Sequence, residues 1–150
     1  MKRAKGMLGC MVAGLLVLAL LGGAGLAGSA SNDDAFVGNW LEPMGGRACL
    51  KIDRVGDHFN IFVYWSGGAS YHREWSMTGT YDSESNAIVC RDCRSVDVEY
   101  DGAGNAHERV TYTGGGAKFT QLNGVILWDD FQEDIAADIM FVKYDGDFGF

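Results

Sequence analysis

The stretch from Phe59 to Tyr81 constrains the fold most, because two runs of alternating apolar residues flank a glycine-rich connector. An apolar period of two residues places each run on one face of a β-strand. The connector 66–70 contains Gly67 and Gly68, which reach positive φ at low cost. The pattern predicts a β-hairpin with the pairs Trp65–Tyr71, Val63–Arg73, Ile61–Trp75 and Phe59–Met77.

Further alternating runs continue on both sides of this hairpin. Glycine-rich or polar connectors predict turns at 67–69, 91–92, 102–104 and 123–124. Asn123-Gly124 is the strongest of these signals, because a type I′ turn needs positive φ at two successive residues. We expect the turn there to pair Phe119 with Trp128 and Gln121 with Ile126.

The fold class follows from the number and order of the strands. We expect about eight to ten short strands in sequential hairpins, and no helical pattern approaches the average helix length. Strands with one apolar face close into a barrel or pack as a sandwich. Hairpin-only connections favour a single antiparallel up-and-down β-barrel, with a β-sandwich as the alternative. In this register all four tryptophans face inward: Trp40, Trp65, Trp75 and Trp128.

Residues 1–30 have the layout of a secretory signal peptide. Three cations, Lys2, Arg3 and Lys5, precede an apolar run and then a stretch of small residues. We expect cleavage after Ala30, with Ala27 as the second choice. The alternative is a retained membrane anchor, although the apolar run is short for a full span. Residues 31–150 are expected to form one β-barrel domain, secreted or otherwise extracytoplasmic (in the periplasm or at the cell surface).

The charge of the chain argues against two classes of partner. Removal of the three cations in residues 1–30 changes the formal net charge from −8 to −11. Nucleic-acid phosphates and anionic lipid headgroups would both repel such a surface. An outer-membrane barrel would need an apolar outer face, whereas polar residues are expected outside, namely Lys51, Glu74, Ser76, Thr78 and Asp97. The sequence therefore predicts no nucleic-acid partner and no membrane span after removal of the signal.

Three motifs resemble known proteins. Gly38-Asn39-Trp40 is similar to the G-x-W that opens the first strand of calycin barrels such as lipocalins and avidins. The segments 74–82 and 123–130, with the strand around Lys118-Phe119-Thr120, resemble repeated features of a family of small uncharacterised exported bacterial proteins. The second resemblance covers most of residues 31–150. Together they imply an exported, calycin-like barrel and assign no activity.

Arg73 is the unusual residue of the hairpin, because the alternation points it inward. A buried guanidinium needs an anionic partner, and Glu108 is the best candidate if the 102–104 turn places it inward opposite Val98. This pair would form a polar ligand site at one end of the barrel, flanked by Trp65 and Tyr71. The alternative is a strand-end arginine that reaches water over an aromatic face.

An acidic segment follows the last predicted hairpin. Its carboxylates at Asp129, Asp130, Glu133 and Asp134 are a weak calcium candidate, because calcium prefers several oxygen ligands on a flexible loop. The spacing is not that of an EF-hand, so a solvated acidic loop is the favoured interpretation. No other metal site and no cofactor are predicted.

The cysteines of residues 31–150 are Cys49, Cys90 and Cys93. Export permits a disulfide, and an odd count leaves one thiol over. If residues 91–92 form a turn, Cys90 and Cys93 flank it. We therefore expect any disulfide to join these two, leaving Cys49 free.

No spacing of serine, histidine and carboxylates matches a catalytic motif. The sequence thus favours a non-enzymatic exported module that binds a protein or a small polar ligand. The alternative is a small enzyme acting on a polar substrate at the barrel mouth with Arg73 and Glu108. Because the inward residues are bulky, and only Ala48 and Gly79 are small, we expect a core filled by side chains. Recognition would then be confined to the mouth or the outer surface.

Overall fold

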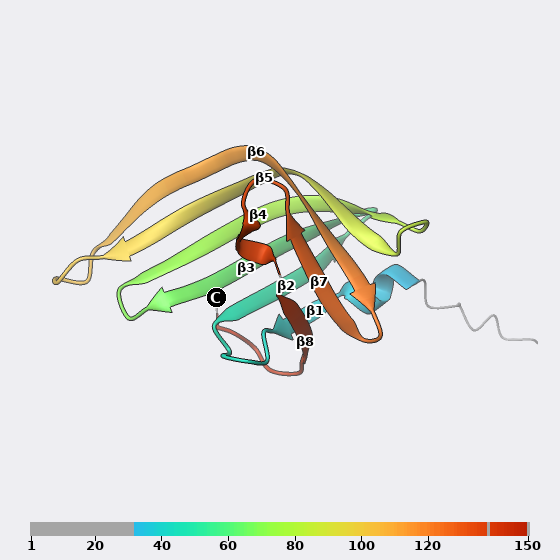
Figure 1. Cartoon of the computed structure of the whole chain (residues 1–150), viewed down its shortest axis with the longest axis horizontal. Helices are drawn as coiled ribbons and strands as arrows, with labels where there is room; N and C mark the ends of the chain where they lie inside the picture. The colour runs from blue at the N-terminus through green and yellow to red at the C-terminus, as the bar shows by residue number, and fades with distance from the viewer. Residues whose placement is uncertain (1–31, 138, 150) are drawn as a thin grey trace, which may run out of the picture.

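The computed structural model describes residues 32–137 and 139–149, so the predicted signal peptide lies outside the described residues. Eight antiparallel strands follow one another in a closed ring (Figure 1). The strands are β1 (Gly38–Leu41), β2 (Ala48–Val55), β3 (His58–Gly68), β4 (Tyr71–Asp82), β5 (Ala87–Tyr100), β6 (Ala106–Leu122), β7 (Val125–Asp130) and β8 (Met140–Tyr144). The 3-10 helices η1 (Asn32–Phe36) and η2 (Asp134–Ala136) precede β1 and β8. The all-β antiparallel prediction is confirmed, with a ring of strands rather than a sandwich.

The register of the β6–β7 hairpin is the predicted one. Phe119 pairs with Trp128 and Gln121 with Ile126. The central hairpin forms, but its pairing is offset by two residues, so that Phe59 faces Gly79 and Ile61 faces Met77. Strand pairing continues to Gly68 and Tyr71, so the turn is shorter than the predicted connector. A bulge lies between Ser66 and Gly68. An offset of two keeps every side chain on its predicted face.

The predicted turn at 91–92 is wrong. β5 runs through this segment, and Asp92 is a bulge residue with φ 58° between the pairs Arg91–Gly116 and Cys93–Gly115. The extra residue reverses the alternation, because it shifts every later side chain by one position. Asp97 therefore faces inward, whereas an outward position was predicted, and Cys93 is buried on the same face. Tyr100 lies on the opposite face and is 42 % exposed.

The interior of the ring is filled by large side chains that are almost fully buried. Trp75 and Trp128 meet edge to face with ring centroids 5.0 Å apart, and Phe119 stacks on Trp128. The other buried members include Trp40, Leu50, Ile52, Phe59, Ile61, Val63, Ile88, Ile126 and Phe141. Gly79 leaves no space for a guest, because a Cβ there would lie 2.5 Å from Ile88 Cγ2 and 2.8 Å from Cys90 Sγ. The expected side-chain-filled core is confirmed.

The two ends of the barrel differ. At the end that contains the 123–124 turn, η1 inserts the fully buried Phe36, and Trp40 Nε1 donates to the Phe36 carbonyl at 2.8 Å. Arg54 holds η1 in place through Asp33 and Asp34 at 2.6 and 2.9 Å. The opposite end, called the mouth below, is formed by the connections 42–47, 69–70 and 101–105 and by residues 131–137, which follow β7.

Strands β3 to β6 extend past the closed ring at the mouth (Figure 1). β7 pairs only with residues 117–122 of β6, so residues 106–116 of that strand continue beyond it. The segment 131–137, with η2, lies on the concave side of this extension (Figure 1). Gly115 and Gly116 permit this approach, because a Cβ at Gly115 would lie 2.8 Å from Gln132 and one at Gly116 2.9 Å from Phe131.

Candidate functional site

A buried carboxylate, Asp97, organises the mouth. Its side chain is 2 % exposed and accepts hydrogen bonds from Arg73 Nε at 2.5 Å and the Tyr71 hydroxyl at 2.6 Å. Arg109 of β6, which is largely exposed, contacts the other carboxylate oxygen. Burial alone would raise the pKa of Asp97, but the hydrogen bonds from Arg73 and Tyr71 and the two positive charges hold this pKa below its usual value.

Arg73 joins this carboxylate to the segment 131–137. Its Nη1 donates to Glu133 at 2.6 Å, and its guanidinium lies 5.7 Å from the centre of the Trp75 ring. Hydrogen bonding to Asp97 and the charges of both carboxylates raise the pKa of Arg73, so it stays charged. Arg73 therefore ties β4 and β5 to the segment that covers the mouth.

Asp130 forms a second polar group just above the core. Its Oδ2 accepts from the Tyr112 hydroxyl at 2.8 Å and from Trp75 Nε1 at 3.2 Å, and its Oδ1 accepts from the Gln132 amide at 3.0 Å. Burial, followed by the hydrogen bond to Asp130, raises the pKa of Tyr112. This phenol therefore remains a donor at neutral pH, and Asp130 fixes the start of the connection.

A cavity of about 320 Å³ lies at the mouth beside Trp65. Most of its lining is apolar, and the lining residues are Glu42, Met44, Arg47, Ala48, Trp65, Ile139 and Met140. Trp65 lies directly opposite Arg73 in the β3–β4 pair, so the cavity and the Asp97 group are adjacent on the inner face. The loop on the other side is preformed, since the Glu42 carboxylate accepts from the Met44 and Gly45 amides at 2.6 and 2.9 Å.

The predicted site residues are only partly brought together. Tyr71 and Arg73 share Asp97, and Trp65 lies next to Arg73. The predicted pairing of Arg73 with Glu108 is wrong: Glu108 is exposed and faces outward opposite Val98, because the bulge at Asp92 exchanged the faces of β5. Asp97, Arg109 and Tyr112 were not predicted as site residues. The inward position of Arg73 indicated that an acidic partner must lie nearby, and Asp97 lies directly across from it on β5.

The acidic segment does not converge on one point. Within the described ranges no group of three or more histidine, cysteine or acidic side chains could hold a metal ion. Asp130 accepts from Tyr112 and Trp75, and Glu133 binds Arg73. Asp129 and Asp134 are exposed.

The three described cysteines are free thiols, so a Cys90–Cys93 disulfide is not present and Cys49 is free as predicted. Cys90 and Cys93 lie on one continuous strand and are 1 % and 0 % exposed. Burial, with the charges of Asp130 and Asp92, raises the pKa of Cys93 to about 11, and burial likewise raises that of Cys90. Neither thiol has the lowered pKa of a redox-active cysteine.

These environments predict the order of thiol labelling. In folded residues 31–150 at pH 8, we expect iodoacetamide to modify the half-buried Cys49 at least about tenfold faster than Cys90 or Cys93, because only thiolates react. Peptide mapping by mass spectrometry over time measures this order, and the urea-unfolded chain is the control in which all three react alike. Equal labelling in the folded protein would contradict the buried positions.

Comparison with protein-family models, curated proteins and solved structures finds no match for this chain. The resemblance to calycins and to the exported bacterial family stays a prediction. In the described part of the chain, no helix is both long enough and apolar enough to cross a bilayer.

Proposed function

We propose that this chain is an exported, non-enzymatic binding module that takes a small amphipathic ligand at the mouth of its barrel. The observation that carries the proposal is the cavity of about 320 Å³ beside Trp65. It lies at the open end of a barrel whose inner side chains are almost fully buried. Export itself rests on the signal-like residues 1–30.

The lining of the cavity resembles that of small-molecule sites in general. Such sites measure roughly 300–1,000 Å³ and are mostly apolar, with a few polar groups that orient the ligand. Here Met44, Trp65, Ile139 and Met140 supply apolar surface, and the exposed Arg47 stands at the rim. The guanidinium of Arg47 is anchored by one hydrogen bond to the Ser66 carbonyl at 3.1 Å and keeps further donors.

A neighbouring hollow extends the same surface. It measures about 420 Å³, shares Ile139 and Met140 with the first cavity, and is also lined by Leu127, Trp128 and Asp129. Ile139 and Met140 therefore connect the two, and the apolar surface continues from the cavity into this hollow.

Together these features favour a ligand with an apolar body and an anionic or hydrogen-bond-accepting end. The charged side chains next to the cavity are already paired, because Arg73 binds both Asp97 and Glu133. They hold the wall of the site in place. A preformed site loses less conformational entropy when it binds.

The fluorescent dye 1-anilinonaphthalene-8-sulfonate has this chemistry and serves as the probe. We expect it to bind folded residues 31–150 at one site, and we expect Trp65→Ala to weaken the dissociation constant by about tenfold or more through loss of the aromatic wall. Arg47→Ala should weaken binding less and make it less dependent on salt. Fluorescence titration at two salt concentrations measures both effects.

Two variants serve as controls, because one removes an aromatic ring and the other an arginine elsewhere on the surface. Tyr100→Ala removes an exposed aromatic ring from the outer face, and Arg91→Ala removes an exposed arginine from β5. Both should bind the dye like the unmodified chain, with unchanged near-ultraviolet circular dichroism. Dye binding that is absent, or equally weakened by the controls, would overturn the proposal.

A further inference from the structure

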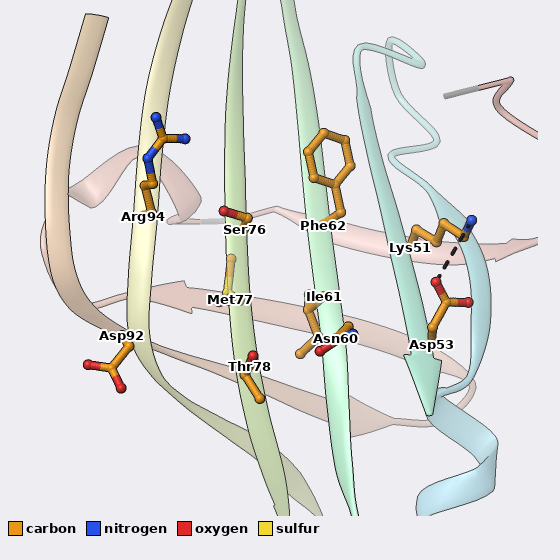
Figure 2. Close-up of a pocket in the computed structure, with 10 residues that line it drawn as sticks. All are labelled: Lys51, Asp53, Asn60, Ile61, Phe62, Ser76, Met77, Thr78, Asp92 and Arg94. Carbon is orange, nitrogen blue, oxygen red and sulfur yellow. Dashed lines mark ion pairs between the residues drawn. The ribbon is translucent and has the colours of Figure 1, made fainter. Parts of the chain in front are cut away.

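A hollow of about 480 Å³ lies outside the barrel, over the middle of β2, β3, β4 and β5 (Figure 2). It is independent of the mouth cavity, because the two share no lining residue. Its outward side chains form two rows across the four strands. The name outer groove is used below for this hollow.

The first row carries cations at both ends. Lys51 pairs with Phe62, Phe62 with Ser76, and Ser76 with Arg94, so the four side chains lie in line across the sheet (Figure 2). Among the described residues that line the outer groove, Phe62 is the one aromatic side chain, and its ring is half-buried.

The second row carries anions at both ends. Asp53 pairs with Asn60 and Asn60 with Thr78, and the row ends at Asp92 on β5 (Figure 2). Each end of the outer groove thus carries one cation and one anion, Lys51 with Asp53 at one end and Arg94 with Asp92 at the other, and amide and hydroxyl groups lie between the two ends (Figure 2).

A local irregularity of the sheet accompanies the hollow. The pairing of β4 with β5 shifts between Ser76 and Thr78, where Asp92 is the bulged residue with positive φ. A bulge bends its strand and redirects the neighbouring side chains. It is this bulge that presents Asp92 and Arg94 along one side of the outer groove.

The polar groups of the outer groove are available to a ligand. Asn60, Ser76, Thr78, Asp92 and Arg94 are exposed, and their side chains make no hydrogen bond or ion pair with the described residues. Lys51 and Asp53 approach each other at 3.8 Å, with side chains 37 % and 58 % exposed. An ion pair so exposed contributes little to stability, so a ligand can separate the two side chains at a small cost in free energy.

We propose that the outer groove binds a neutral saccharide, one sugar ring lying on Phe62. A charged ligand gains little net electrostatic attraction here, because the two positive and two negative side chains of the outer groove cancel in charge. Sugar hydroxyls are both donors and acceptors, so they match the mixture of carboxylate, guanidinium, amide and hydroxyl groups. The C–H face of a sugar ring packs against an aromatic face, which Phe62 supplies. An open groove across four strands also admits a chain of sugars, as sheet faces of other small barrels do.

The test titrates isotope-labelled residues 31–150 with three neutral probes: maltotriose, cellotriose and tri-N-acetylchitotriose. We expect at least one of them to shift the backbone amide signals of Asn60, Phe62 and Thr78 in a saturable way. Phe62→Ala should weaken that dissociation constant about tenfold or more, and Asp92→Asn, which keeps a residue that tolerates positive φ, should weaken it several-fold. Tyr100→Ala, which removes an exposed aromatic ring from β5 outside the outer groove, is the matched control and should have no effect.

Three outcomes would overturn the proposal. The first is that none of the three sugars binds. The second is that the shifts centre on Trp65 and Ile139, since the sugar would then occupy the mouth cavity. The third is that Phe62→Ala and Tyr100→Ala, both with native amide spectra, bind the sugar equally well.

Discussion

Replacing Trp75 by alanine is expected to lower the free energy of unfolding by about 3–5 kcal/mol. Trp75 is fully buried, it meets the Trp128 ring at 5.0 Å, and its Nε1 donates to Asp130. The substitution removes the ring contacts, leaves a cavity in the middle of the barrel and takes one donor from Asp130. Because domains of this size are stable by only about 5–15 kcal/mol, the loss is a large fraction of the total.

Urea unfolding followed by circular dichroism measures this change. Leu122→Ala is the control, since Leu122 is 54 % exposed beside the β6–β7 turn and should cost less than about 1 kcal/mol. A Trp75→Ala variant as stable as the Leu122→Ala variant would show that the ring does not support the core.

Replacing Asp97 by alanine should cost about 3–5 kcal/mol, because it leaves the mostly buried Arg73 without its nearest counter-ion. The loss should depend on pH. The pKa of Asp97 is lower in the folded chain than in the unfolded chain, where aspartate titrates near about 3.9. The carboxylate therefore contributes its full stabilisation above about pH 4, and this contribution disappears as the pH falls through the folded-state pKa.

Unfolding of both proteins at pH 7 and at several values below pH 4 tests this prediction. The difference in stability between the unmodified chain and Asp97→Ala should shrink as the pH falls. Asp53→Ala is the matched control, because Asp53 is exposed and its ion pair with Lys51 is long. A difference that stays constant down to pH 2 would contradict the assigned role of the ionised carboxylate.

The sequence was most informative where turn chemistry determines register. Asn123 and Gly124 adopt φ 53° and 83°, as a type I′ turn requires, and the β6–β7 pairs are those predicted. The central hairpin has a longer, less specific connector, so its register was offset by two residues while its faces were correct. Alternation alone cannot distinguish registers that differ by two.

The bulge at Asp92 explains why the Asp97 group was not predicted. The polar residues Arg91 and Asp92 between two cysteines resemble a turn signal. A turn there would divide the segment into two strands, 87–90 and 93–100, whose inward faces are independent of each other. In a continuous strand, one residue in a left-handed conformation exchanged the faces of everything that follows. The partner of Arg73 was therefore sought at Glu108 instead of Asp97. The connection that brings Glu133 to Arg73 has no periodic pattern from which its path could be predicted.

The most direct test of the account is an NMR titration that separates the mouth of the barrel from its interior. With 1-anilinonaphthalene-8-sulfonate added to labelled residues 31–150, the Trp65 indole and Ile139 methyl signals should shift first and most. The methyl signals of the fully buried Leu50, Ile52, Ile88 and Ile126 should stay in place, because side chains fill the core. Larger shifts at these four core residues than at Trp65 would show that the barrel holds its ligand inside, and would contradict a filled core with recognition at the mouth.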